Sequence, residues 1–243
     1  MTITLIKLIA AHLLGDFILQ PDKLCNMRYC NQMSQRISAN AIHSMIQAIL
    51  SYVFIGIWNL WILPVIIFLS HFLIDYIKTQ YGKNRLPDFV CDQAAHYIVI
   101  FLIWRFLLPD ISMISTTSKI SQSAWIVFTA YIAILTPTSI LVKHFMEYNS
   151  WLPTNSSLKG LPNAGKWIGF FERILILTFI FTDNIEGIGF LLAAKSIFRF
   201  GELNRSKDLK VTEYVLIGTF LSFTVAILTG YTAAWTISIG KEF

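Results

Sequence analysis

Residues 59–78 read NLWILPVIIFLSHFLIDYIK, a stretch that is almost wholly apolar and yet contains His71 and Asp75. A transmembrane helix needs about 20 consecutive apolar residues to cross the hydrocarbon core of a bilayer. The stretch therefore predicts a membrane-spanning helix. An ionisable residue inside such a helix is costly, so His71 and Asp75 are candidates for a functional role.

The motif around these two residues occurs twice in the chain. Residues 70–77 read SHFLIDYI and residues 11–18 read AHLLGDFI, so a His-x-x-x-Asp spacing recurs. After each copy, the next apolar segment carries a histidine near its beginning, His96 and His43 respectively. The pattern predicts a tandem repeat of a helical hairpin, in which both copies have the same orientation in the membrane.

The composition indicates that the rest of the chain is of the same kind. Of its 243 residues, 55% are hydrophobic and only 14% are charged, which excludes an ordinary soluble domain. Membrane-spanning helices are expected at about 2–20, 40–57, 59–78, 88–108, 124–142, 166–183, 185–200 and 213–236. The sequence thus predicts an all-α transmembrane bundle of about eight helices. Residues 1–110 would form the half with the duplicated hairpins, and residues 111–243 would form a C-terminal transmembrane half.

The basic residues predict the orientation of these helices. Lysines and arginines concentrate in the loops that follow the first, third, fifth and seventh segments. By the positive-inside rule these loops are cytoplasmic, and both termini then face the periplasm or the exterior. The same distribution accounts for the net charge of +5, so the charge does not indicate nucleic-acid binding. Membrane lipids are the only partners that the sequence indicates, and the oligomeric state stays open.

The polar residues of the apolar segments are typical of a metal site. Residues four apart share a helix face, so three segments each present an imidazole beside a carboxylate. These groups bind zinc and other divalent metals, and facing helices carry them in di-metal carboxylate proteins. The expected cofactor is a divalent metal ion, with zinc as one candidate. The candidate metal ligands are His12, Asp16, His71, Asp75 and His96, and the candidates for a further ligand or a general base are His43 and Asp92.

Other roles for this polar layer stay open. Histidine–aspartate pairs also act as hydrogen-bonded contacts between helices, or as a relay for protons. The pattern favours a membrane-embedded, metal-dependent hydrolase that opens to the cytoplasm and acts on a lipid or lipid-linked substrate. A transporter for an ion, proton or anion is less favoured, because the outer half of the segments has few ionisable residues. A non-catalytic membrane subunit or sensor is the third alternative.

Four basic residues in the C-terminal half are candidates for contact with a lipid phosphate or another anion: Lys166, Arg173, Lys195 and Arg199. Residues 160–166 read GLPNAGK, which matches the start of a Walker A loop. However, Trp167 stands where the loop needs Ser or Thr, and no strand precedes it, so a nucleotide site is excluded. The simpler alternative is that these long side chains reach out to the membrane surface.

The motifs together resemble one family. The runs HLLGDFILQ at 12–20, SHFLID at 70–75 and DQAAH at 92–96 resemble the bacterial multi-pass membrane family named domain of unknown function 3307. The runs NAGKWIG at 163–169 and AAKSIFRF at 193–200 look like C-terminal motifs of that family. The resemblance therefore extends over nearly the whole chain. It implies a protein of the bacterial inner membrane and carries no established activity.

Overall fold

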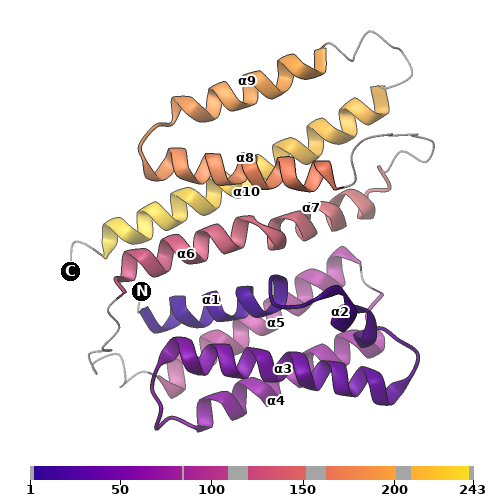
Figure 1. Cartoon of the computed structure of the whole chain (residues 1–243), viewed down its shortest axis with the longest axis vertical. Helices are drawn as coiled ribbons and strands as arrows, with labels where there is room; N and C mark the ends of the chain where they lie inside the picture. Colours follow the sequence, from indigo (N-terminus) through magenta and orange to yellow (C-terminus); the bar gives the residue numbers. More distant parts are fainter. Residues whose placement is uncertain (1–2, 84, 109–119, 152–162, 201–208, 241–243) are drawn as a thin grey trace. The chain divides into compact units, whose positions relative to one another are not determined.

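The computed structural model describes residues 3–83, 85–108, 120–151, 163–200 and 209–240, and it is all-helical over these ranges (Figure 1). The predicted all-α class is therefore confirmed. The chain divides into two compact units, Met1–Thr129 and Ala130–Phe243, which we call unit 1 and unit 2. The predicted boundary at residue 110 lies outside the described residues and stays a prediction.

Unit 1 is a bundle built around one long helix, α3. Its elements are α1 (Ile3–Phe17), α2 (Asp22–Arg28), α3 (Met33–Ile55), α4 (Ile62–Tyr81), α5 (Leu86–Leu102) with its π-helical continuation η1 (Ile103–Leu107), and the first part of α6 (Gln122–Ile134). Helix α3 packs against α1, α2 and α4, and α5 packs against α1 and α4 (Figure 1). These contacts enclose the polar faces of α1, α3, α4 and α5 in one interior.

The interior of unit 1 changes from apolar to polar along the helices. The buried residues of α4 recur at every fourth position: Leu63, Ile67, His71, Asp75 and Thr79. At the apolar end, the stripe joins a core of buried side chains from the neighbouring helices: Leu8, Ala48, Ile55, Ile100, Ile103 and Leu108. At the other end, buried polar side chains from α1, α2, α3 and α5 surround Asp75. An apolar core thus supports a polar interior within one bundle.

A sharp break between α1 and α2 brings an additional cation into this polar interior. The two helix axes differ by 84°. Pro21 precedes α2 in an extended conformation and has no N–H to continue a helix. Arg28, in the last turn of α2, is buried, and its Nε donates a hydrogen bond of 2.8 Å to Asn40 Oδ1 of α3. The sequence predicted a single segment at 2–20 and no helix after it.

Unit 2 contains a helix that is interrupted at Leu135. Its elements are the end of α6, α7 (Thr136–Tyr148), α8 (Ala164–Phe181), α9 (Glu186–Phe200) and α10 (Leu209–Ile239), and α10 packs against α7 and α8. Pro137 has no N–H for the carbonyl of Ala133, and Thr138 Oγ1 donates to that carbonyl instead, at 2.9 Å. The sequence predicted one membrane span over 124–142, and α6 and α7 together form one such span, Gln122–Tyr148, in which the proline causes the interruption at Leu135.

The helices indicate a membrane protein. Among the described residues, five spans are long and apolar enough to cross a bilayer, or six if the bent pair of α1 and α2 is one span. The five are Met33–Ile55, Ile62–Tyr81, Leu86–Leu107, Gln122–Tyr148 and Val211–Ile239. Two of the eight predicted spans, 166–183 and 185–200, are not among these. Helix α8 carries three charged residues within 18, and α9 has only 15 residues.

Candidate functional site

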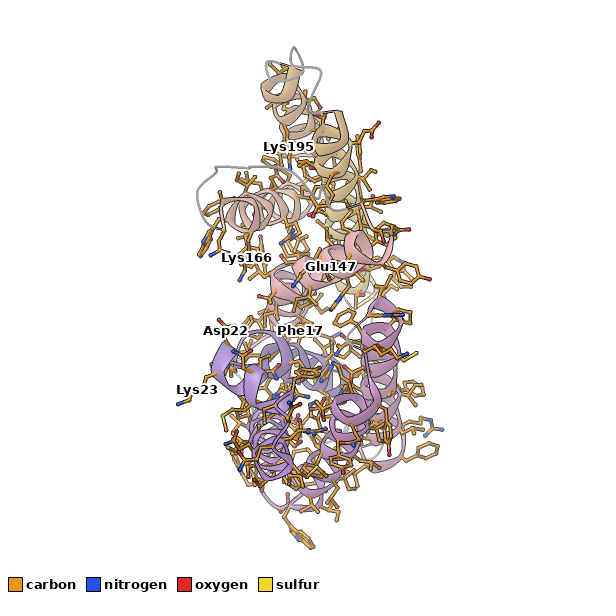
Figure 2. The ribbon with its side chains drawn as sticks, turned by 90° about the vertical axis from the view of Figure 1, so that its right-hand side faces the viewer. Phe17, Asp22, Lys23, Glu147, Lys166 and Lys195 are labelled. Atoms are coloured by element: carbon orange, nitrogen blue, oxygen red, sulfur yellow. The ribbon has the colours of Figure 1, made fainter. Side chains whose placement is uncertain are left out.

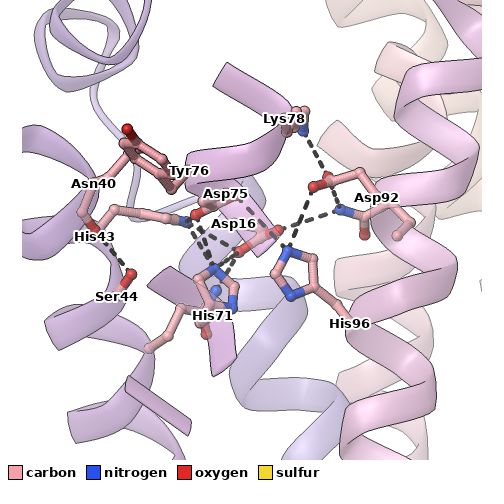
Figure 3. Close-up of polar contacts among 12 residues, drawn as sticks. Asp16, Asn40, His43, Ser44, His71, Asp75, Tyr76, Lys78, Asp92 and His96 are labelled. Carbon is pink, nitrogen blue, oxygen red and sulfur yellow. Dashed lines mark hydrogen bonds and ion pairs between the residues drawn. The ribbon is translucent and has the colours of Figure 1, made fainter. Parts of the chain in front are cut away.

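The structure brings all seven predicted metal-site and catalytic residues into one buried group, which we call the His/Asp cluster, and Figure 3 labels all of them except His12. Its members are His12 and Asp16 of α1, His43 of α3, His71 and Asp75 of α4, and Asp92 and His96 of α5. Each histidine exposes 4% of its surface or less. The cluster is therefore shielded from the surroundings of unit 1, and its polar atoms depend on one another.

The helix ends explain why these residues meet. Helices α1 and α4 end close to their His-x-x-x-Asp motifs, whereas α5 begins just before Asp92, so the motifs lie at the same end of the bundle. Within each motif the two side chains share a face. His71 Nε2 lies 3.3 Å from Asp75 Oδ2, and His96 Nε2 lies 3.6 Å from Asp92 Oδ1. In α1, His12 Nδ1 lies 3.7 Å from Asp16 Oδ1.

Three atoms converge at the centre of the cluster. His43 Nε2 and His71 Nε2 lie 3.1 Å apart, and they lie 3.2 and 3.3 Å from Asp16 Oδ1. At such a separation the two nitrogens cannot both carry a hydrogen without crowding, so at least one presents a lone pair. Around a zinc ion with bonds of about 2.0 Å, tetrahedral ligand atoms stand about 3.3 Å apart. The triangle has the dimensions of one face of such a tetrahedron.

Asp75 connects this triangle to the rest of the cluster. Its Oδ1 lies 2.6 Å from Arg28 Nη2, in an ion pair whose two side chains are almost completely buried. Its Oδ2 lies 3.3 Å from His71 Nε2 and 3.5 Å from His43 Nε2. Within the described part of the chain, Oδ2 has no hydrogen-bond partner. Asp75 thus offers one oxygen to a fixed cation and keeps the other unpaired toward the two imidazoles.

Asp92, like Asp75, binds a cation with one carboxylate oxygen and directs the other toward an imidazole. Its Oδ2 accepts a hydrogen bond of 2.6 Å from Lys78 Nζ and a second one from Gln93 Nε2 at 3.2 Å. Its Oδ1 faces His96 Nε2, and neither atom has a hydrogen-bond partner among the residues that the structure describes. Buried polar atoms are nearly always hydrogen-bonded, so these unpaired atoms call for a further ligand.

Two glutamines hold the carboxylate of Asp16. Gln47 Nε2 of α3 donates to Asp16 Oδ1 and also to the backbone carbonyl of His12, at 3.1 Å. Gln93 Nε2 of α5 donates to Asp16 Oδ2 at 3.3 Å, and Gln93 Oε1 lies 3.3 Å from His12 Nε2. These contacts fix Asp16 in relation to three helices.

Sequence reasoning missed the two cations and two of the amides that surround the cluster. Arg28 and Lys78 counted only as basic loop residues, and Asn40 and Gln47 received no role. A signal was present in α3, where the polar side chains of Asn40, His43, Ser44 and Gln47 follow the spacing of one helix face. No comparable signal marked Arg28, because its burial depends on the break before α2.

The side chains of the cluster could hold a metal ion. In the described residues, three groups of side chains can each bring ligand atoms to within 4.8 Å of one another. They are His12, His71 and His96; Asp16, His43 and His71; and Asp75, Asp92 and His96. Imidazole and carboxylate suit a divalent ion such as zinc. The geometry of the predicted ligand set therefore permits the expected cofactor.

Three of the four basic residues predicted for anion contact have described side chains, and these lie in different environments of unit 2. Lys166 is exposed at the beginning of α8, where its Nζ lies over the ring of Phe170 (Figure 2). Lys195 Nζ donates a hydrogen bond of 2.6 Å to Glu172 Oε2. Arg173 is buried and donates to protein oxygens. The side chain of Arg199, like residues 160–162 of the glycine-rich run, lies outside the described residues. Lipid contact at these positions stays a prediction.

Comparison with known proteins identifies a family. The model of the family described as "Protein of unknown function (DUF3307)" matches residues 4–127, which include the whole His/Asp cluster. No curated protein and no solved structure matches the chain. The C-terminal motifs lie beyond the matched residues, so their resemblance stays a prediction. Because the match extends over half of the chain and contains every member of the cluster, the chain belongs to the DUF3307 family.

Proposed function

We propose that the His/Asp cluster binds a divalent metal ion and that the protein is a membrane-embedded, metal-dependent hydrolase for a lipid or lipid-linked substrate. The observation that carries this proposal is a set of buried atoms in the cluster that make no hydrogen bond. Within the described residues, Asp75 Oδ2, Asp92 Oδ1 and His96 Nε2 lack hydrogen-bond partners. A buried polar atom without a partner costs about 1–3 kcal/mol, and a bound cation would remove that cost for all three.

The ion pairs around the cluster support the same proposal. Arg28 and Lys78 each hold one oxygen of a carboxylate and leave the other free. Metal-ligating carboxylates are commonly oriented by such outer contacts. The alternative is that the ion pairs only lock the helices together. In that case Asp75 Oδ2 and Asp92 Oδ1 would pair only with the imidazoles that face them, at 3.3 and 3.6 Å.

The charge of the cluster also favours a cation that carries hydroxide. Three aspartates against Arg28 and Lys78 leave one formal negative charge when the histidines are neutral. One divalent ion with a bound hydroxide brings the sum to zero. Charge balance matters because an uncompensated charge is costly in the low-dielectric interior. A metal ion lowers the pKa of bound water to about 7, which supplies that hydroxide at neutral pH.

The proposed reaction is hydrolysis of an ester. A base takes one proton from the bound water, the hydroxide adds to the phosphorus or acyl carbon, and the ester bond breaks. The leaving alcohol then receives the proton from the same group. Asp92 is our candidate for this base, because its Oδ1 is unpaired. His43 belongs to the central triangle, so we assign it as a ligand.

The apolar outer surface of unit 1 supports a lipid substrate. The outward positions of α3 and α4 carry exposed apolar side chains, among them Ile42, Ile49, Leu69 and Leu73. In a bilayer these faces contact acyl chains. We further propose that the protein lies in the bacterial inner membrane with both termini outside, so that the cluster faces the cytoplasmic leaflet.

The test is the metal content of protein purified in detergent, measured by mass spectrometry for the wild type, His71→Ala and Asp16→Ala. His144→Ala is the matched control, because His144 is the histidine of α7 and lies in unit 2. We expect stoichiometric metal in the wild type and the control, and loss of metal in both cluster variants. A folded, metal-free wild type would contradict the proposal.

A second measurement separates hydrolase from transporter. Metal-loaded protein is mixed with phospholipid micelles, and release of inorganic phosphate, headgroup and fatty acid is followed. Protein in sealed liposomes is assayed for flux of protons and metal ions. Hydrolysis that is lost in Asp92→Asn supports the proposed reaction. Flux without hydrolysis contradicts it and favours transport.

A further inference from the structure

The His/Asp cluster contains two complete ligand sets that share no residue. One set is Asp16, His43 and His71, and the other is Asp75, Asp92 and His96. Each set combines imidazole with carboxylate, so each can hold a divalent ion. The third group, His12 with His71 and His96, borrows one histidine from each set and so does not add an independent position.

The two sets lie side by side. The imidazole rings of His71 and His96 are stacked, with centroids 4.1 Å apart and an angle of 25° between their planes. Metal ions in two-metal sites stand about 3.5–4 Å apart. The stacked rings therefore place the two sets next to each other, as a metal pair requires.

Asp75 faces both sets. Its Oδ2 lies 3.3 Å from His71 Nε2 in the first set, and its Oδ1 lies 3.7 Å from His96 Nε2 in the second. A carboxylate that directs one oxygen to each of two ligand sets has the geometry of a bridging ligand. Asp75 belongs to α4, which packs against α3 and α5, and it lies between His43 and Asp92 (Figure 3).

The second set contains two buried atoms that make no hydrogen bond unless a ligand binds there. His96 Nε2 and Asp92 Oδ1 face each other at 3.6 Å without hydrogen bonds within the described residues, and both residues are at least nine-tenths buried. A cation in the first set alone would leave these two atoms unpaired. This observation points to a ligand in the second set independently of the first.

We infer that the cluster is a dinuclear centre, in which Asp75 bridges one metal ion held by Asp16, His43 and His71 and a second held by Asp92 and His96. In this arrangement Asp92 would be a ligand in place of the base, and the two ions together would supply hydroxide by loss of a proton from bound water to solvent. The inference rests on the proposed metal-binding function and specifies its stoichiometry. With two divalent ions the cluster together with Arg28 and Lys78 carries a formal charge of +3 when its histidines are neutral, which a bound hydroxide and an anionic substrate would offset. Such a charge favours an anionic substrate, so the geometry is suited to a phosphate ester more than to a neutral acyl ester.

Arg28 and Lys78 have a defined place in this arrangement. Arg28 Nη2 lies 2.6 Å from the bridging residue at Oδ1, and Lys78 Nζ lies 2.6 Å from Asp92 Oδ2. Both cations therefore contact the second set and neither contacts Asp16. We expect the second position to bind its metal more weakly, because a nearby cation opposes a divalent ion.

The experiment uses the full chain in detergent, stripped of metal and titrated with Mn²⁺, with bound metal counted per chain. Electron paramagnetic resonance then reports whether the bound ions are coupled magnetically. We expect two ions per chain, with a coupled signal at saturation and a single-ion signal at the first equivalent. Two uncoupled ions would overturn the bridging role of Asp75. One ion at saturation would overturn the dinuclear centre but keep the proposed function, and no bound ion would overturn both.

Variants assign the two positions. His43→Ala removes a ligand of the first set only, Asp92→Asn removes one of the second set only, and Asp75→Asn removes the bridge. We expect one ion per chain in each of the first two variants, without coupling, and full binding in the His144→Ala control. Loss of both ions from His43→Ala with no effect of Asp92→Asn would overturn the assignment. If a variant fails to fold, the count and spectrum of the wild type still decide the inference.

Discussion

Gly15 lies directly against the side-chain amide of Gln47, and a Cβ at residue 15 would stand 2.6 Å from Gln47 Cδ and Nε2. The same Nε2 donates to Asp16 Oδ1 and to the carbonyl of His12. We therefore expect Gly15→Ala to push Gln47 away and release Asp16. Loss of such an outer contact lowers metal affinity by about 10- to 100-fold. Competition with a chelator of known affinity measures the change.

The control for this substitution is Gly189→Ala in α9. A Cβ at Gly189 meets nothing within 4 Å, so this variant changes a helical glycine without a clash. Its metal affinity should equal that of the wild type. If Gly15→Ala also retains the wild-type affinity, then Gln47 does not position Asp16 for a metal.

The Arg28–Asp75 pair gives a prediction for stability. Arg28→Met leaves the buried Asp75 carboxylate without its cation, and breaking a buried pair in this way costs about 3–5 kcal/mol. We expect that loss in metal-free protein, and a smaller loss in metal-loaded protein because the bound ion compensates the carboxylate. Unfolding in detergent, with and without metal, measures both values.

Two further variants test this explanation. Arg28→Met combined with Asp75→Leu removes both charges and should recover most of the stability of the metal-free protein. Lys143→Met breaks an exposed pair, whose side chains are 68% and 44% exposed, and should cost less than about 1 kcal/mol. Equal losses for Arg28→Met with and without metal would indicate that the metal does not contact Asp75.

The residues of the cluster could be found from the sequence because helical spacing is local information. In α1, α4 and α5 a histidine and an aspartate four apart share a face, and an apolar stretch places that face in the interior. The convergence of the helices follows from their alternating directions. What the sequence could not supply was the partner of each carboxylate. Whether Asp75 meets Arg28 or a metal depends on distances between helices.

The differences in the fold arise where a proline interrupts an apolar run. Pro21 and Pro137 each remove a backbone donor. The sequence shows these prolines but not what replaces the missing hydrogen bonds. In unit 2 the replacement is a hydroxyl of Thr138 together with the guanidinium of Arg173 from another helix. Such contacts between distant residues are not encoded in the pattern of either segment.

Arg173 holds the interrupted helix of unit 2. Its guanidinium donates to the carbonyls of Ile134 and Leu135, and also to Ser139 Oγ at 2.7 Å and Ser222 Oγ at 2.8 Å. We expect Arg173→Met to leave these buried oxygens unpaired, at about 1–3 kcal/mol for each group that finds no new partner. Arg173→Lys should recover only part, because a single ammonium cannot span four acceptors.

Unfolding in detergent measures these two variants, and Lys166→Met is the control because Lys166 is exposed. The metal content of all three should be that of the wild type, since the His/Asp cluster lies in unit 1. A stable Arg173→Met protein would mean that other donors satisfy the break at Leu135.

The proposed orientation can be tested at the two ends of α4. Trp61, before the helix, is 69% exposed, and Tyr81, at its last residue, is 77% exposed. In a chain whose three cysteines are replaced by serine, we expect Trp61→Cys to react with a membrane-impermeant maleimide in intact cells. Tyr81→Cys should react only after the membrane is opened, because the positive-inside rule places its loop in the cytoplasm. The reverse pattern would invert the proposed topology and turn the cluster toward the exterior.

Removal of the metal should lower the unfolding temperature only of proteins whose His/Asp cluster is intact. A ligand that binds only the folded state stabilises it by about 4 kcal/mol when its free concentration is a thousand times its dissociation constant. We therefore expect a chelator to lower the unfolding temperature of the wild type and of His144→Ala, and readdition of metal to restore it. His71→Ala and Asp16→Ala should unfold at one temperature with or without the chelator, because their binding set is incomplete. A wild type that is equally indifferent to the chelator would identify the cluster as a network of hydrogen bonds and ion pairs, in which Arg28 and Lys78 compensate the carboxylates of Asp75 and Asp92.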